Sequence, residues 1–118
     1  MRIDIDETTV DDGSHYFCNG GLFTGELEET DPAGNVIALT PVTNGRPHGV
    51  DREWYPDGTL RSETTVVDGV ATGTSREWHR NGRLAEERDF DERGRLIATR
   101  KWTEDGTPVQ REPRNKAR

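Results

Sequence analysis

The side chains that could carry out catalysis or bind a metal in this 118-residue sequence are three histidines, one cysteine and many carboxylates. Zinc sites favour a second histidine or cysteine three or four residues away; His48 and His79 have none at that spacing, and His15 has Cys18 alone. The acidic residues lack the spaced ligand series, ending in a bidentate carboxylate, that a calcium loop needs. The single Cys18 excludes an internal disulfide and is typical of a reducing compartment. The sequence therefore predicts no metal and no cofactor.

Local motifs for nucleophilic catalysis are also missing. Ser14, Ser62 and Ser75 have no base at a suggestive spacing, and there is no phosphate-binding loop, nucleophile elbow or Cys-x-x-Cys pair. A site assembled from residues far apart in the sequence stays open on this reasoning. The expectation is nevertheless a protein that is not an enzyme.

The acidic residues are unevenly distributed along the chain. Residues 1–39 contain nine acids and one base, a net −8, whereas residues 40–118 contain 14 acids and 15 bases, a net +1. This asymmetry favours a basic partner over direct contact with nucleic acid or an anionic membrane. A solvated face that keeps a small protein soluble is the alternative. The candidate partner-binding residues are Asp4, Asp6, Asp11, Asp12, Glu26, Glu28, Glu29 and Asp31.

The elements that must position these side chains are indicated by an internal repeat of 24 residues. Arg52-Glu53-Trp54 is matched by Arg76-Glu77-Trp78, and the same shift carries Trp78 onto Trp102. A fixed period of this length is the signature of a repeat architecture. We expect the three tryptophans to stack as a core ladder on one face of the sheet. The alternative is a partner-binding surface, because aromatic residues are enriched in binding hot spots; its candidates are Trp54, Tyr55, Trp78 and His79.

The chain between the repeated motifs predicts short strands joined by tight turns. Asn-Gly occurs three times and Asp-Gly four times, and both dipeptides suit type I′ hairpin turns. Strands are expected at 2–6, 25–30, 36–39, 50–55, 60–67, 74–79 and 84–90. Turns are expected at Asn44-Gly45, Asp57-Gly58, Asp68-Gly69, Asn81-Gly82 and near Gly94. The fold class is therefore all-β, an elongated antiparallel β-meander with an acidic cap (1–21), a repeat domain (22–108) and a basic tail (109–118).

The repeated pattern Gly-x-x-x-Glu-Trp-Tyr/His-x-Asp/Asn-Gly-x-Leu resembles the MORN repeat, in particular the variant found in bacterial antitoxins of the YwqK type. The residues that carry the resemblance are Gly49, Glu53, Trp54, Tyr55, Asp57, Gly58 and Leu60, followed by Gly73, Glu77, Trp78, Asn81, Gly82 and Leu84. The resemblance implies a cytoplasmic antitoxin or immunity protein that blocks the active site of a cognate toxin, often a nuclease or deaminase with a basic groove. It transfers no catalytic residue. In the first copy of the repeat, the position equivalent to Trp54 is occupied by Thr30, so that copy lacks the aromatic residue.

Two other expectations complete the functional hypothesis. A MORN-type scaffold or lipid- or protein-binding module is the alternative function, but it would need a basic face toward anionic headgroups. The open edges of a meander allow a homodimer or strand addition by a partner. No apolar stretch is long enough for a signal peptide or a membrane span, so a soluble cytoplasmic protein is expected.

Overall fold

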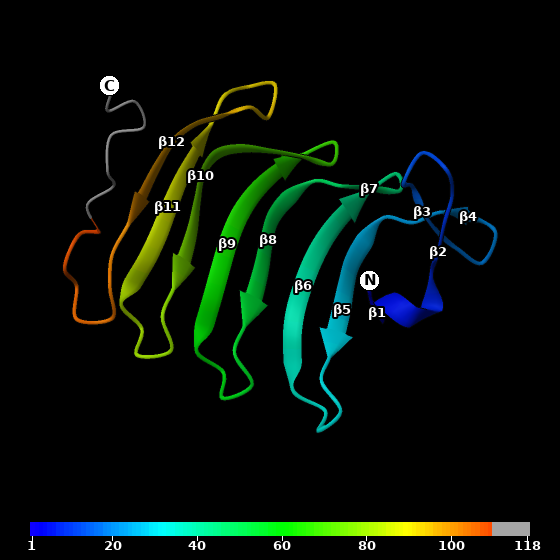
Figure 1. The fold of residues 1–118 in the computed structure, drawn as a ribbon. Coiled ribbons are helices and arrows are strands. Elements are labelled where there is room, and N and C mark those ends of the chain that lie inside the picture. The colour runs from blue at the N-terminus through cyan, green and yellow to red at the C-terminus, as the bar shows by residue number, and fades with distance from the viewer. Residues whose placement is uncertain (110–118) are drawn as a thin grey trace.

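The structure is a computed structural model that describes residues 1–109. Its main feature is an elongated single-layer sheet, and the molecule measures 56 × 34 × 19 Å along its principal axes (Figure 1). The sheet order is β1-β5-β6-β8-β9-β10-β11-β12, with β7 paired to β6. From β5 onward neighbouring strands are antiparallel and follow one another in the chain. The expected all-β meander is confirmed.

The elements of the main sheet and of a smaller three-stranded sheet have the following bounds. The main sheet contains β1 (Arg2–Asp4), β5 (Gly25–Thr30), β6 (Val36–Thr43), β7 (Arg46–Pro47), β8 (Gly49–Trp54), β9 (Leu60–Val67), β10 (Val70–Trp78), β11 (Leu84–Phe90) and β12 (Leu96–Lys101). The small sheet contains β2 (Thr9–Val10), β3 (Tyr16–Cys18) and β4 (Gly21–Leu22), and it follows the 3₁₀ helix η1 (Ile5–Glu7).

The N-terminal strand is shorter than expected. Its alternating sequence continues to Asp6, but the strand ends at Asp4, whose carboxylate accepts a hydrogen bond from the Asp6 amide at 2.8 Å and caps η1. Local capping by aspartate competes with strand pairing here. β1 also pairs parallel to β5, so it stands outside the antiparallel meander.

The turns are of two kinds, where the sequence predicted one. Both turn residues have positive φ at Asn19-Gly20, Asn44-Gly45 and Asp68-Gly69, as type I′ requires. At Asp57-Gly58 and Asn81-Gly82 only the glycine does. The reason is local: the Asp57 carboxylate accepts from the Thr59 amide at 2.9 Å, and Asn81 does the same for Arg83. These side-chain bonds favour a longer loop with the glycine at a bulge.

The longer loops repeat along one rim of the sheet. They span 31–35, 55–59, 79–83 and 103–107, and each is closed by the same pair of backbone hydrogen bonds. Four strands show a register shift beside such a loop, at Glu29/Thr30, Glu53/Trp54, Glu77/Trp78 and Asp89/Phe90. A fifth loop of this kind, 91–95, lies on the opposite rim, where the type I′ turns are found. We call these the long-loop rim and the short-turn rim.

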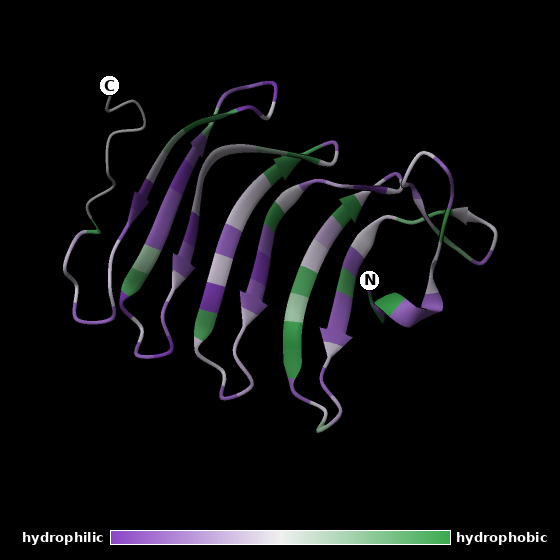
Figure 2. Cartoon of the chain, in the orientation of Figure 1, coloured by the Kyte–Doolittle hydropathy of each residue, from purple (hydrophilic) through white to green (hydrophobic). Residues whose placement is uncertain are grey.

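The buried core lies at the N-terminal end of the sheet, not along the tryptophans. Phe23, Leu27 and Val42 are buried, and residues of β1, η1 and β3 pack against them. Trp54, Trp78 and Trp102 are only half-buried, so the expected core ladder is wrong. In Figure 2, β6 is mostly hydrophobic whereas β8 and β11 are mostly hydrophilic. A single-layer sheet has no second layer to cover its rings beyond the cap.

The expected basic tail begins at 109, and most of it lies outside the described residues. Pro108 bridges to Trp102, and the Val109 amide donates to the Lys101 carbonyl at 2.9 Å. The chain therefore turns back along β12 as far as it is described.

Candidate functional site

The predicted acidic residues do not form one patch. Glu26 and Glu28 alternate with the buried Leu27 and so share one face of β5, where Asp4 is the register partner of Glu28. Arg2 lies 2.9 Å from Glu28 and neutralises part of this group. Glu29 lies on the face that Leu27 occupies.

Two of the predicted acidic residues hold turns together. Asp31 accepts hydrogen bonds from the amides of Ala33 and Asn35 at 3.0 and 2.9 Å and from the Asn35 side chain at 3.1 Å. The bonds from Asn35 lower the pKa of this carboxyl below its usual range. Asp11 accepts from the Gly13 and His15 amides in the same way, and its pKa is lowered mainly by the His15 bond. The remaining two, Asp6 and Asp12, are exposed.

A second set of carboxylates, which the charge count alone missed, forms a row across the face that carries Leu27. The cross-strand register links Glu29 to Ala38, Ala38 to Glu53, Glu53 to Ser62, Ser62 to Glu77 and Glu77 to Glu86. Residues directly opposite in a sheet point to the same face. We call Glu29, Glu53, Glu77 and Glu86 the acidic row. The signal in the sequence was a glutamate recurring every 24 residues, at 29, 53 and 77.

The acidic row has few counter-ions among residues 1–109. Glu29 and Glu77 have no ion pair there, and Glu53 has one long contact of 3.9 Å to Arg61. Glu77 lies directly opposite Glu86, a like-charge arrangement that costs stability. Arg88 Nε lies 2.6 Å from Glu86 Oε2, but it is not aligned as a hydrogen bond, so this enclosed oxygen has no hydrogen-bond partner. Glu29 and Glu77 are therefore left uncompensated, whereas Glu86 lies beside Arg88 and directly opposite Lys101 of β12.

Asp51 adds to the same face, two residues before Glu53 along β8. Its carboxylate accepts from the Thr40 hydroxyl at 3.1 Å. Burial raises the pKa of Asp51, and the nearby charges of Glu53 and Glu29 raise it further, against the effect of the Thr40 bond. The raised pKa therefore reflects burial first and the proximity of two other carboxylates second.

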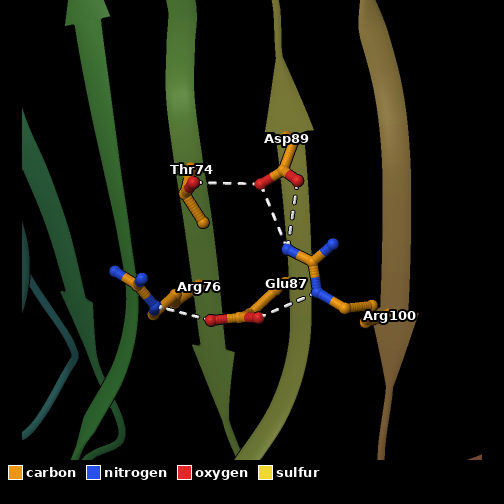
Figure 3. Close-up of polar contacts among 5 residues, drawn as sticks. All are labelled: Thr74, Arg76, Glu87, Asp89 and Arg100. Carbon is orange, nitrogen blue, oxygen red and sulfur yellow. Dashed lines mark hydrogen bonds and ion pairs between the residues drawn. The ribbon is translucent and has the colours of Figure 1, made fainter.

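The opposite face of the sheet carries compensated charge. Arg52 lies 2.8 Å from Glu63, Arg76 lies 2.8 Å from Glu87, and Arg100 lies 3.0 Å from Glu87. Arg100 also binds Asp89 at 3.1 Å, and Thr74 donates to Asp89 at 2.9 Å (Figure 3). We call Arg52, Glu63, Arg76, Glu87 and Arg100 the ion-pair ladder. Because its acids and bases alternate across strands, this face presents little net charge.

The alternative aromatic candidates lie at the long-loop rim. The Tyr55 hydroxyl donates to the Trp78 carbonyl at 2.7 Å, and His79 Nε2 lies 2.9 Å from the Trp102 carbonyl. Arg61 and Arg80 place their guanidinium groups 5.9 and 5.0 Å from the Tyr55 ring centre. Tyr55 and His79 thus make equivalent contacts, each joining one repeat to the next. Half-burial leaves Trp54 and Trp78 partly accessible.

Within residues 1–109, no group of three or more His, Cys, Asp or Glu side chains is placed to hold a metal ion. In the same part of the chain, no helix is long and apolar enough to cross a membrane. The Cys18 thiol is free and half-buried.

Comparisons with known proteins give little guidance. No protein-family model matches the sequence, and no curated protein matches it. Among solved structures, the chain is similar to a crystal structure of an S. aureus TarM mutant in complex with fondaparinux, alpha-GlcNAc-glycerol and UDP. The identity is 13% and the TM-score 0.45, over 88% of this chain and 19% of that chain. The chain therefore spans about a fifth of the length of that protein, and a likeness at this level carries no argument about function.

Proposed function

We propose that this protein is an antitoxin or immunity protein of the cytoplasm, which binds a basic surface of a toxin domain and blocks its active site. The observation that carries the proposal is the acidic row. Its four glutamates lie on four strands of one face, and Glu29 and Glu77 have no ion pair among residues 1–109, while the opposite face is neutralised by the ion-pair ladder.

The spacing of the acidic row suits an extended basic surface. Glu29, Glu53 and Glu77 lie on every second strand, so about 10 Å separates neighbours at the usual strand spacing. This distance is comparable to the Debye length of about 8 Å at physiological salt, so the charges act together on an approaching partner. A basic active-site groove is a surface that such a field attracts and orients.

The exposed acids at the N-terminal end extend this field without belonging to the row. Glu26 and Asp6 are exposed, and Glu28 is half-buried beside Arg2. We therefore move the centre of the proposed binding surface from residues 4–31 to the acidic row, with Glu29 common to both. A homodimer through edge strands stays a prediction. At the β12 edge, Pro108 and Val109 return only as far as Trp102 and Lys101.

The test is association with a toxin domain encoded beside this gene. The triple variant Glu29→Gln/Glu53→Gln/Glu77→Gln changes the net charge from −7 to −4. Its matched control, Asp57→Asn/Glu104→Gln/Asp105→Asn, makes the same change at exposed positions of the long-loop rim, outside the row. Stopped-flow mixing at low salt should give an association rate about tenfold lower for the row variant. Cells that express the row variant should no longer be protected from the toxin. Equal rates for the two variants would remove the acidic row from the binding surface. A toxin that neither variant nor parent binds would leave the scaffold function as the better hypothesis.

A further inference from the structure

A groove lies at the short-turn rim, between the β9–β10 hairpin and the 91–95 loop, which project side by side at the upper edge of Figure 1. One part, of about 560 Å³, is lined by Thr72, Gly73, Phe90 and the loop. A second part, of about 420 Å³, continues to Val67, Asp68 and Val70. We call both parts together the rim groove. Both parts are open depressions and not enclosed cavities.

The groove follows from specific features of the sequence. Gly73 has a φ of 72°, and the pairing of β10 with β9 is interrupted between Thr72 and Arg76. The 91–95 loop is held against the hairpin, because a Cβ on Gly94 would lie 2.3 Å from Val70 Cγ1. Only glycine allows this approach, so the wall of the groove is fixed by packing.

The preceding hairpin on the same rim shows what covers such a turn in this protein. At Asn44-Gly45, the Tyr16 amide donates to the Gly45 carbonyl and the Gly45 amide donates to the Phe23 carbonyl, both at 2.7 Å. Leu22 packs so closely that a Cβ on Gly45 would lie 2.7 Å from its Cδ2. An extended segment with an apolar side chain therefore covers this turn.

The next hairpin, 24 residues later, has the same turn without the cover. The 91–95 loop contacts Val70 through Gly94, but Val67 and Val70 remain 44% and 42% exposed. The two hairpins are joined directly, since the Gly69 amide donates to the Pro47 carbonyl at 2.8 Å. The rim groove is thus continuous with the surface on which the cap already docks.

The charges around the groove favour a cationic neighbour. Asp91 is paired with Arg95 at 2.8 Å. Arg93 contributes one positive charge, but Asp68 and Glu92 contribute two negative ones, and the Asp68 side chain is 75% exposed and 3.9 Å from His48. The net charge of the rim groove is therefore −1, on a protein of net charge −7.

We propose that the rim groove receives an apolar side chain from an extended basic segment of the partner, as the cap supplies Leu22 to the preceding turn. This inference rests on the proposed function and adds the anchor that steering alone does not provide. A buried apolar side chain surrounded by complementary charge is the usual composition of a binding hot spot.

The test uses defined peptides and the full-length protein labelled with ¹⁵N. The probe is acetyl-Lys-Lys-Phe-Lys-Lys-amide, and its control replaces phenylalanine with serine. The phenylalanine peptide should shift the amide signals of Thr72, Gly73, Phe90 and Arg93 to saturation. The serine peptide should shift signals only along the acidic row, because it retains the charge and lacks the anchor.

Two matched valine variants separate the groove from general effects. Val67→Asn removes an apolar wall residue, and Val50→Asn makes the same change at a valine that is 37% exposed on β8, outside the groove. Val67→Asn should weaken the phenylalanine peptide at least about threefold, and Val50→Asn should leave it unchanged. The groove proposal is overturned if both valine variants weaken binding of the phenylalanine peptide equally. It is also overturned if both peptides shift the amide signals of the groove equally. Loss of the acidic-row shifts alone would count against the proposed function and leave the groove intact.

Discussion

At the scale of single residues, the position of a carboxylate decides its role more than its place in a charged run. Glu28 and Glu29 are adjacent, yet Glu28 pairs with Arg2 on one face while Glu29 belongs to the acidic row on the other. Asp31, two residues later, holds a loop with three hydrogen bonds. Strand alternation and local capping therefore separate three neighbouring acids that a charge count groups together.

Asp51 carries an unfavourable, partly buried charge on the acidic face, and replacing it should stabilise the protein. Its folded pKa is raised above the usual 3.8 by burial and by Glu53 and Glu29. The ionised form therefore opposes folding, and stability falls as the pH rises through the interval above 3.8. Asp51→Asn keeps an oxygen for the Thr40 hydroxyl and removes the charge.

Urea unfolding at a series of pH values tests this prediction. At pH 7 the free energy of unfolding of the Asp51→Asn variant should exceed that of the parent by less than about 1 kcal/mol. The gain should vanish in acid, where Asp51 is protonated in both states. Asp12→Asn, an exposed change of the same kind, should show no gain. A loss of stability at pH 7 would mean that the Asp51 carboxylate makes a favourable contact that outweighs its burial.

At the scale of elements, the ion-pair ladder fixes how consecutive strands pair. Arg52, Arg76 and Arg100 recur every 24 residues, and each faces a glutamate on the neighbouring strand. A strand slipped by one residue would move every arginine to the acidic face. In these polar strands, which have little apolar alternation, the cross-strand ion pairs therefore specify the register. In a two-layer fold, burial of one apolar face would specify it.

Glu87 is the best-connected acid of the ladder and should matter more than Glu63. Glu87 binds both Arg76 and Arg100, and these bonds hold its pKa below the usual range, whereas Glu63 binds Arg52 alone. Glu87→Gln should therefore cost about 1 kcal/mol and Glu63→Gln about half of that. Because the folded pKa of Glu87 is lowered, its contribution is present at neutral pH and is lost as the pH falls through that value.

Urea melts of the two variants in low salt and in 1 M NaCl measure the effect. High salt should shrink the difference, because the Debye length falls to about 3 Å at that concentration. Identical costs for Glu63→Gln and Glu87→Gln at low salt would contradict a cooperative ladder.

At the scale of the whole molecule, stability is concentrated at one end. The buried residues Phe23, Leu27 and Val42 join the cap to β5 and β6, while the rest of the described sheet is held by strand pairing and half-buried side chains. Repeat proteins gain stability from interfaces between neighbours, and a capping unit protects the end of the array. The core of this protein lies where the cap packs against the first strands of the repeat domain.

Leu27→Ala should therefore destabilise the protein more than the same change in a central repeat. Leu27 is 1% exposed, and a leucine deleted from a closed core costs about 3 kcal/mol. Leu84 is half-buried, and Leu84→Ala should cost about half as much, since the site is already open to water. Thermal or urea unfolding measures both. Equal costs would show that the repeats contribute as much burial as the cap.

Several features of this fold were predictable because they depend on local chemistry. The 24-residue period, the glycines at the turns and the strands from Gly25 onward follow from turn residues that repeat in register. The choice between type I′ turns and longer loops was not predicted, although Asp57 and Asp68 precede glycine alike. The difference arises from hydrogen bonds and strand ends that a dipeptide does not specify.

The all-β repeat of hairpins follows from local sequence, because period and turn chemistry are properties of neighbouring residues. The composition also shows that acids exceed bases, but not where the excess acts. Strand pairing places Glu29, Glu53, Glu77 and Glu86 on one face. It also places the repeated arginines beside acidic partners on the other face. Cross-strand register sets those distances, and register depends on bulges and pairings between residues far apart in the chain. The position of the core also depends on the tertiary structure. The cap folds onto β5 and β6 and closes the core there, and the tryptophans lie outside it.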